Sequence, residues 1–460
     1  MHAFLIGALA WAAQAATVPA GVDVRWHATL PQDSKGYGLV FGSGTPTDWV
    51  EPNLEGSLSI GFDTHNPRST NWFDADGNIY GRPEREVSLH WRGMEIANRL
   101  CPSELKGPAG HDAQVQVRLV VGGSEVTVRV GGKPVYDRFF VPDLTLHRSD
   151  VRFGPDSSVR VEGLRVRWDR EVRAPEPPVR VVAFDRVLND AQHHRWEGEV
   201  GFPESTEPFG RVVCTLKLEA TPNGLDPWDR LAQLFLYDDK GRRFEVLRWI
   251  TPYRKGWTWT LDVTDLLPLF RGKRRLEGLC ETWGAGWLVS VTFDFYKGRL
   301  SPRPFKVTPI WSATAILGQK EHPIAAALPP TGIRIDGRTK AAKVRTVVTG
   351  HGMSPNTGNA AEFLALWRRL RVGECDFENQ LWKDDNYLNP CRPQGGTWKF
   401  DRAGWAPGDV VRPWVVDVTR CVKPGQNAVF RYEIQPYENL TPEPGNPARH
   451  VVEAALIEYR

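Results

Sequence analysis

The sequence predicts an all-β protein made of tandem antiparallel β-sandwiches. Short Val-rich runs in which apolar and polar residues alternate recur along the 460 residues, and turn residues separate them. Gly and Pro number 43 and 36, together about 17% of the chain, against roughly 12% in average proteins. They lie in short groups between the runs. No long segment has the 3.6-residue period of an amphipathic helix. At about 150 residues per domain, the length favours three domains.

The first block spans residues 17–172. Apolar residues alternate with polar ones over 115–121 and again over 126–130, and Gly122-Gly123 stands between the two runs. We expect a β-hairpin with a two-residue loop suited to positive φ. The proline-rich stretch 174–178 ends the block, because consecutive prolines remove hydrogen-bond donors and stiffen the chain.

Two further blocks of similar length follow, over residues 179–312 and 328–460. Proline-containing stretches separate them, and both blocks show short strands between turn signals. Each contains the tripeptide Asp-Val-Thr late in its length, at 262–264 and at 417–419. We interpret this as a weak sign of two related sandwiches.

The charge balance narrows the choice of partner. Lys and Arg number 58 against 55 Asp and Glu, a net charge of +3, which argues against nucleic acid or an acidic membrane as the principal partner. The chain has 19 Trp against 3 Met. Flat amphipathic rings stack on sugars as well as filling cores. For Trp49, Trp72 and Trp91 in the first block, a core position is favoured over sugar binding.

The first 16 residues are typical of a signal peptide, which predicts a secreted or periplasmic protein. The apolar run Ala3–Ala13 is too short to span a bilayer, and Ala13-Gln14-Ala15 fits a cleavage site, although no Lys or Arg precedes the run. No later stretch has 18 consecutive apolar residues, so we expect no membrane insertion. Six cysteines are compatible with disulfides in an oxidising compartment, in any of 15 pairings.

Three segments place carboxylates or an arginine beside tryptophan: Asp226–Arg230, Glu281–Trp283 and Asp401–Trp405. A fourth carboxylate, Glu362, follows Asn359 by three residues. Hydrolysis of a glycosidic bond or an amide needs an acid or base at the scissile atom and a cation or donor for the oxyanion. A sugar also needs an aromatic face for its C–H groups.

Each candidate has a structural alternative. Asp226-Pro227 is a common turn opener, and Asp229-Arg230 can be a surface ion pair. Asn359 and Glu362 match a capping box. Glu281 can face solvent from an alternating strand, and Arg402 can simply pair with its neighbour Asp401.

Other chemistries have little support in the sequence. His193-His194 is the one adjacent histidine pair, and no CxxC, GxSxG or P-loop is present. The segment 74–78 resembles the start of a calcium loop, but Arg85 stands where the loop needs a glutamate. We therefore expect no metal and no cofactor.

Residues 179–460 resemble the peptide-N-glycosidase F family of bacterial secreted amidases. The resemblance rests on six pieces in the family's order: Trp228-Asp229-Arg230, Ile250–Tyr253, Asp262–Asp265, Glu281–Trp283, Ala361-Glu362 and Asp401–Gly408. It implies two jelly rolls side by side, with a metal-free site in the groove between them. The first block resembles a concanavalin-like lectin or glucanase sandwich by strand pattern.

The resemblance implies hydrolysis of the bond between an N-linked glycan and its asparagine, which leaves aspartate and a glycosylamine. It implies catalytic roles for Asp229, Glu362 and Arg402, with Arg402 polarising the amide carbonyl. Substrate contacts would come from Glu281, with Arg230, Trp228, Trp283 and Trp405 around the sugar. N-glycosylated proteins or peptides would be the partners, and we expect a monomer.

This sequence departs from the family's pattern at several places. Pro227 stands where the family has a glutamate, and Phe363 where it has tryptophan; Ala360, Leu364 and Ala406 stand where cysteine is expected. Two other functions make different demands on the sequence. A non-catalytic glycan-binding protein has no need of all four polar candidates. A copper monooxygenase on paired jelly rolls predicts His-x-His and Met ligands, which do not occur.

Overall fold

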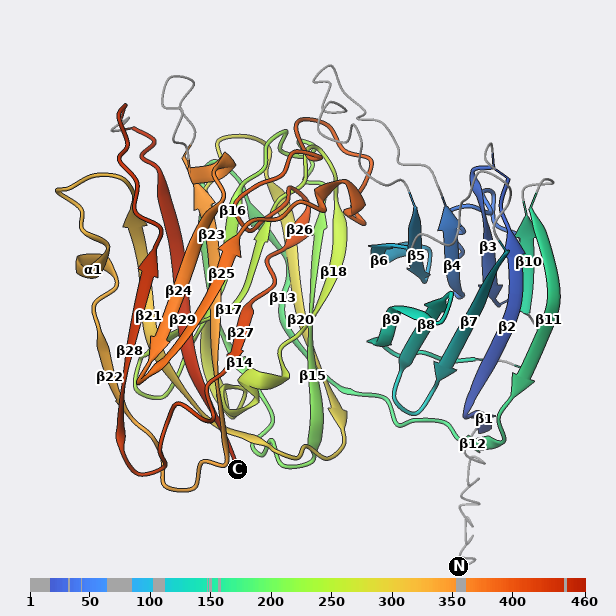
Figure 1. Cartoon of the computed structure of the whole chain (residues 1–460), viewed down its shortest axis with the longest axis horizontal. Helices are drawn as coiled ribbons and strands as arrows, with labels where there is room; N and C mark the ends of the chain where they lie inside the picture. The colour runs from blue at the N-terminus through green and yellow to red at the C-terminus, as the bar shows by residue number, and fades with distance from the viewer. Residues whose placement is uncertain are drawn as a thin grey trace, which may run out of the picture. The chain divides into compact units, whose positions relative to one another are not determined.

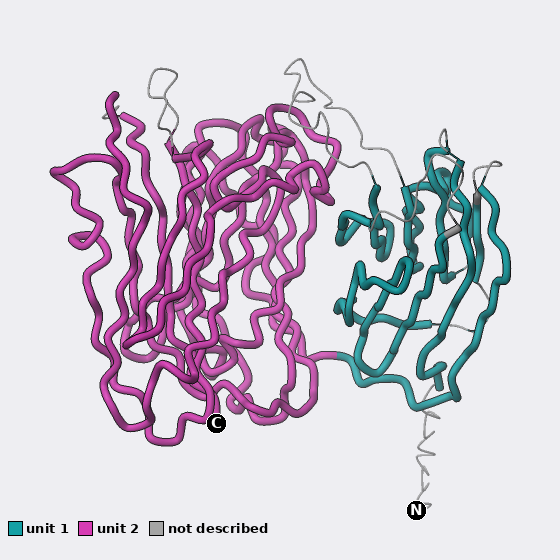
Figure 2. The backbone as a smooth tube through the Cα atoms, viewed as in Figure 1, with its two compact units in different colours: residues 1–65, 83–177 teal, residues 66–82, 178–460 magenta. Residues whose placement is uncertain are grey.

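The computed structural model describes residues 17–31, 34–42, 44–63, 85–101, 112–146, 148, 151–155, 159–352, 361–441 and 445–460. The predicted signal peptide, Trp72, the segment 74–78 and Asn359 lie outside these residues. The chain divides into two compact units, one made of residues 1–65 and 83–177 and the other of residues 66–82 and 178–460 (Figure 2). Strands dominate both units (Figure 1), which confirms the all-β prediction.

The first unit is a sandwich of two five-stranded antiparallel sheets. One sheet has the order β10 (Val151–Pro155), β3 (Gly36–Phe41), β4 (Leu58–Asp63), β5 (Glu86–Trp91), β6 (Met94–Leu100). The other has the order β11 (Arg160–Trp168), β2 (Gly21–Thr29), β7 (Asp112–Val120), β8 (Glu125–Val130), β9 (Lys133–Phe140). Short strands β1 (Thr17–Pro19) and β12 (Glu171–Arg173) pair with each other.

The core of this sandwich contains one of the tryptophans in question. Trp91 is buried in the core cluster, as the core interpretation predicts. The ring of Trp49 lies directly on Gly154, where a Cβ atom would come within 1.6 Å of it. Both rings are therefore used in packing.

The predicted hairpin of the first unit forms, but its loop is longer than expected. β7 ends at Val120 and β8 begins at Glu125, so four residues connect them. The positive φ falls on Ser124, at 50°, and not on the two glycines. The alternation continues to Val121 in sequence, but Val121 already accepts a turn hydrogen bond from the backbone N–H of Ser124.

The second unit holds two jelly rolls. The sheets of the first are β13 (Val179–Asn189), β20 (Trp287–Lys297), β15 (Phe209–Glu219), β18 (Trp257–Asp262), and β14 (Arg195–Gly201), β19 (Lys273–Cys280), β16 (Leu231–Tyr237), β17 (Arg243–Ile250), β26 (Asp409–Val410). The sheets of the second are β21 (Pro304–Ile316), β29 (Arg449–Tyr459), β23 (Ala341–His351), β27 (Trp414–Asp417), and β22 (Thr331–Arg334), β28 (Asn427–Ile434), β24 (Leu366–Val372), β25 (Cys375–Leu381).

Helical structure in the described residues is short. It comprises α1 (Ile324–Ala327) and the 3₁₀ turns η3 (Thr264–Leu269), η4 (Ala361–Phe363) and η5 (Asn386–Leu388). None of the described helices is long and apolar enough to cross a membrane.

The strand pairing differs from the predicted blocks at two places. β21, which starts at Pro304, pairs along its length with β29, so residues 304–312 belong to a sheet of the second jelly roll rather than to the first. β26 comes from the second jelly-roll segment but pairs with β17 of the first, through Trp249 and Val410. The apolar runs alone do not reveal either pairing, because register depends on the partner strand.

One disulfide joins Cys375, at the start of β25, to Cys421, with 5.9 Å between their Cα atoms. The other four cysteines are buried and take no part in a disulfide. Burial raises the pKa of the Cys214 and Cys280 thiols well above the usual range, because an apolar environment disfavours the thiolate. Only one of the three bridges that six cysteines would allow is therefore present.

Candidate active site

Asp226 organises the loop that leads into β16. Its carboxylate accepts a hydrogen bond from the backbone N–H of Trp228 (2.9 Å) and another from the hydroxyl of Thr282. A side chain at Gly284 would bring a Cβ atom to 2.4 Å from the same carboxylate, so only glycine allows this approach. Asp226 is fully buried. The prediction of a turn opener is confirmed, and Asp226 has a structural role.

Thr251, directly after β17, fixes the next residues. Its hydroxyl donates to the carbonyl of Trp228 (3.0 Å) and accepts from the backbone N–H of Arg230 (2.7 Å). Its own N–H donates to the carbonyl of Arg230 (3.0 Å). Asp229, which lies between these two residues, is therefore held on a constrained backbone.

Glu362 comes from the second jelly roll, on the single turn η4. Its carbonyl accepts the N–H of Ala403 (2.9 Å), and the carbonyl of Ala403 accepts the N–H of Gly350 at the end of β23. The glutamate and the segment that carries Arg402 are thus joined through the backbone. The capping-box alternative depends on Asn359, which lies outside the described residues.

Arg402 connects the two carboxylates. Its Nε lies 3.3 Å from Oε1 of Glu362, and its Nη2 lies 3.6 Å from Oδ2 of Asp229. The guanidinium is only 1% exposed, whereas the Asp229 and Glu362 side chains are 17% and 20% exposed. One buried cation therefore holds carboxylates from both jelly rolls at a surface that solvent reaches.

The other hydrogen bonds of Arg402 go to backbone carbonyls and to a threonine hydroxyl. Nη1 donates to the carbonyls of Thr397 (2.8 Å) and Phe400 (2.9 Å), and Nη2 donates to the hydroxyl of Thr397 (2.7 Å). Each of the three nitrogens therefore contacts at least one protein oxygen. This arrangement favours a positioning role, which differs from the direct polarisation of a substrate carbonyl that the resemblance implies.

Trp405 also differs from its expected role as a wall of the site. It is 3% exposed, and its indole N–H donates to the carbonyl of Gly350 (2.7 Å). Its ring lies 4.8 Å from the guanidinium carbon of Arg402 and stacks on His351, with 5.3 Å between ring centroids. The ring therefore supports Arg402 from below and offers no sugar-binding surface.

Burial controls the protonation of the two carboxylates. It raises the pKa of Glu362 to about 7; the negative charge of Asp229 adds to this, and Arg402 opposes it. Burial also raises the pKa of Asp229, while the charge of Arg402 and a hydrogen bond with Tyr253 oppose that rise. Near neutral pH the Glu362 carboxyl can both release and accept a proton, which general acid–base chemistry requires.

The remaining predicted residues form an exposed rim. Trp283 is 68% exposed, and the guanidinium carbon of Arg230 lies 4.8 Å from the centroid of its ring. Trp228 and Glu281 are exposed as well. Arg230 also pairs with Asp226 at 3.8 Å. These side chains can contact a ligand without rearrangement.

Two further residues at the site, Tyr253 and Arg449, were assigned no role from the sequence. Tyr253 contacts Asp229, and its hydroxyl lies 3.2 Å from that of Thr397, the residue that binds Arg402. Arg449, at the start of β29, interacts electrostatically with both Glu362 and Glu281. Tyr253 belongs to a segment that the resemblance already included, whereas nothing in the sequence around Arg449 distinguishes it.

The two histidines singled out in the sequence have protein partners. Nδ1 of His193 lies 2.7 Å from Oδ1 of Asp190, and Nε2 of His194 lies 2.7 Å from the carbonyl of Thr282. Within the described part of the chain, no three His, Cys, Asp or Glu side chains are grouped as metal ligands would be.

Comparison with known proteins supports the family resemblance. The family model "Peptide-N-glycosidase F, C terminal" matches residues 324–454. The peptide-N(4)-(N-acetyl-beta-D-glucosaminyl)asparagine amidase F of Elizabethkingia miricola is 28% identical over 310 residues, which is 62% of this chain and 86% of that protein.

Solved structures agree on the fold. The structure of PNGase F, a glycosylasparaginase from Flavobacterium meningosepticum, matches with a TM-score of 0.55 at 24% identity over 62% of this chain and 96% of that one. The structure of PNGF-II matches with a TM-score of 0.50 at 11% identity, over 95% of this chain and 98% of that one. Residues 324–454 thus match the C-terminal model of the peptide-N-glycosidase F family, and the related amidase sequence and the shared fold support the same resemblance.

Proposed function

We propose that the chain is an amidase that hydrolyses the bond between an N-linked glycan and the side chain of asparagine. The observation that carries this proposal is the contact of one buried guanidinium, Arg402, with two partly exposed carboxylates from different jelly rolls. Two carboxylates at one cation supply proton transfer and orientation at a single point. The family relationship points to the same class of reaction.

In this proposal Glu362 is the general base. Its pKa of about 7 suits proton transfer near neutral pH. The ionised carboxylate takes a proton from a water molecule as the water oxygen attacks the amide carbon. The protonated Glu362 then returns that proton to the departing nitrogen as the C–N bond breaks. Water and the amide thus give aspartate on the peptide and a glycosylamine, and the enzyme returns to its starting state.

Asp229 and Arg402 have complementary roles. Asp229 accepts a hydrogen bond from the N–H of the linkage and so orients the amide toward Glu362. Arg402 holds both carboxylates in place, since its nitrogens already contact protein oxygens. Arg402 is therefore a positioning residue in this mechanism.

The exposed rim would bind the glycan. The face of Trp283 suits the C–H groups of a sugar, and Glu281 suits its hydroxyls. Arg230, which is partly exposed and lies over Trp283, is the cation best placed to meet the developing oxyanion. Trp228 would extend the aromatic surface.

The direct test is incubation with a denatured N-glycoprotein in water enriched in ¹⁸O. Release of glycan, with a new aspartate that carries the label, supports the proposal. Asp229→Ala should abolish release, whereas Asp185→Asn, an exposed aspartate on β13, should leave it unchanged. Full activity of the Asp229→Ala protein would refute the residue assignment.

The alternative function is glycan binding without hydrolysis, since the exposed rim requires no catalysis to hold a sugar. Glycopeptide binding by the wild-type chain without any release would favour it. We further propose that the chain works in a secreted or periplasmic setting, and the Cys375–Cys421 disulfide supports this because such bonds persist in oxidising compartments.

A further inference from the structure

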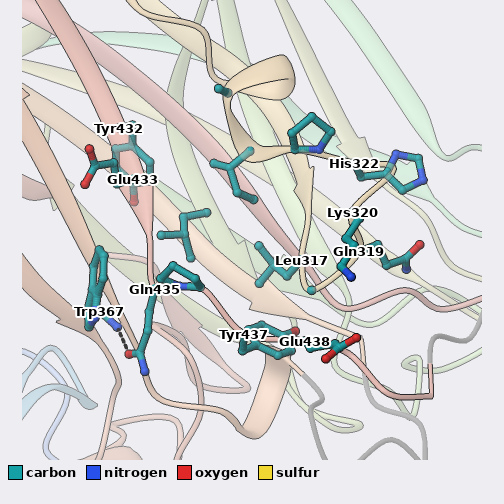
Figure 3. Close-up of a pocket in the computed structure, with 16 residues that line it drawn as sticks. Leu317, Gln319, Lys320, His322, Trp367, Tyr432, Glu433, Gln435, Tyr437 and Glu438 are labelled. Atoms are coloured by element: carbon teal, nitrogen blue, oxygen red, sulfur yellow. Dashed lines mark hydrogen bonds between the residues drawn. The ribbon is translucent and has the colours of Figure 1, made fainter.

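A cavity lies on the flank of the second jelly roll, and its lining contains none of the residues assigned above. Its volume is about 490 Å³. One wall is the segment 317–323 between β21 and α1 together with the first residues of α1, and the other is the end of β28 with the residues that follow it. Trp367 of β24 closes one side (Figure 3).

The cavity exists because β22 is short. β22 pairs with β28 only from Asn427 to Phe430, although β28 continues to Ile434. Beyond Phe430, α1 and the turn before it take the place of a paired strand, and α1 packs against β28 there. The space between a helix turn and a strand end is open to solvent.

The walls are fixed by local contacts. Gly318 has φ = +71°, and a Cβ atom there would lie 2.7 Å from the backbone nitrogen of Asn439 and 2.9 Å from the ring of Tyr437. The N–H of Asn439 donates to the carbonyl of Gly318 (2.9 Å). Glycine thus allows the two walls to meet, and the cavity is formed before any ligand arrives.

Trp367 and Gln435 are also held together. The backbone N–H of Trp367 donates to the side-chain oxygen of Gln435 (3.1 Å), and the N–H of Gln435 donates to the carbonyl of Trp367 (2.9 Å). The indole ring also lies 4.8 Å from the guanidinium carbon of Arg369. The amide of Gln435 therefore has a fixed orientation beside an aromatic ring (Figure 3).

The chemistry of the lining suits a neutral, hydroxyl-rich ligand. Trp367 and Tyr437 offer aromatic faces, and two amides, Gln319 and Gln435, offer donors and acceptors. Of the two lining carboxylates, Glu433 is balanced by Arg369 (3.5 Å) and Arg371 (3.3 Å), and the single charge of Glu438 is offset in number by that of Lys320 in the same lining. Aromatic faces beside planar polar groups match the C–H faces and hydroxyls of sugars, and the volume lies within the range of roughly 300–1,000 Å³ for small-ligand sites.

We propose that this cavity binds a neutral oligosaccharide, as a site separate from the amidase centre. One sheet connects the cavity with the candidate active site. On the cavity side, Ile316 precedes the lining residue Leu317 and pairs with Arg449, and Arg449 pairs in turn with His351 of β23. Adjacent strands lie about 4.8 Å apart, so roughly 10 Å separates the backbones of Ile316 and His351. A sugar bound here does not require hydrolysis at the other site.

The experiment measures binding of free chitobiose and of a free mannose oligosaccharide by calorimetry. Neither ligand contains an asparagine amide, so catalysis does not interfere. All proteins carry Trp283→Ala, which removes the exposed ring of the amidase rim. Trp367→Ala and Tyr437→Ala are the test variants. Trp414→Ala is the matched control, because this half-buried Trp of the same jelly roll also lies 4.8 Å from an arginine, Arg368.

The expected result is binding in the Trp283→Ala protein and in the control. Affinity should fall at least about tenfold in each test variant, the size of effect expected from loss of one stacking ring. Absence of sugar binding, equal binding in the test variants, or capture of an extended peptide in place of sugar would overturn the proposal. Amidase activity is measured separately in the wild-type chain, so either site can fail without the other.

Discussion

Replacement of Glu362 by glutamine should make the protein more stable at alkaline pH while it removes activity. The pKa of this carboxyl is about 7 in the folded chain, against an ordinary value of 4.5. Its ionised form is thus disfavoured by folding. The contribution of the protonated Glu362 carboxyl to the free energy of unfolding is fully present below pH 4.5, and it is lost as the pH rises through about 7.

The magnitude follows from the size of the shift. A rise from 4.5 to about 7 corresponds to about 3 kcal/mol of unfolding free energy at 1.36 kcal/mol per pH unit. Glutamine stays neutral at every pH and has the same shape, so Glu362→Gln avoids this cost. The free energy of unfolding of the variant should exceed that of the wild type by up to about 3 kcal/mol at pH 8, and the two should be equal at pH 4.

Scanning calorimetry at both pH values measures the effect as a difference in melting temperature between variant and wild type. Glu321→Gln is the control, because Glu321 is exposed on a turn and its replacement should change the melting temperature at neither pH. A variant that is less stable than the wild type at pH 8, or a difference that is the same at pH 4 and 8, would refute the reasoning. Glycan release by the wild type should rise with pH through about 7, as the base ionises.

Three other outcomes are expected. Arg402→Lys keeps the charge but loses the planar fork that donates hydrogen bonds to four oxygens, so glycan release should fall at least about 100-fold. The variant should still fold, with reduced stability, as tryptophan fluorescence would show. Gly396→Ala should lower the rate without changing the pH profile, because φ there is +64° and a Cβ atom would lie 2.6 Å from the ring of Tyr253; an unchanged rate would show that this ring is not needed for orientation. Cys375→Ser should lower the unfolding free energy by about 4 kcal/mol, because the bond to Cys421 closes a 46-residue loop, and urea unfolding with and without reductant checks this value.

Local patterns predicted much of the fold. The alternation of apolar and polar residues indicated strands in all three blocks, and Asp226-Pro227 indicated a turn that the structure contains. The pairing of β26 with β17 was not predictable, because a two-residue strand has no period of its own. The four-residue hairpin loop was missed for a related reason: the pattern extends to Val121, but the hydrogen bonds of the ladder end earlier.

The candidate site was predictable only in its residue types. Asp229, Glu362 and Arg402 stood out as polar residues near aromatic ones, and the structure places them within contact distance. The depth of each side chain could not be read from the sequence. Trp283 and Trp405 occupy similar sequence contexts, yet one is exposed and the other is buried under a guanidinium. Arg449 reaches the site only because β29 begins beside the end of β23.

The exchange of β26 between the jelly rolls has a consequence for how the molecule is assembled. Asp409 and Val410 complete a sheet whose other strands come from residues 195–280, and Arg248 of that sheet donates to the carbonyl of Val451 (2.7 Å) in the other jelly roll. Each jelly roll therefore has backbone groups whose hydrogen-bond partners belong to the other jelly roll. A cut between residues 297 and 304 would leave two fragments that each lack a neighbour for exposed backbone groups. Because each half contributes a carboxylate at Arg402, the proposed catalytic groups come together only when the two halves are associated.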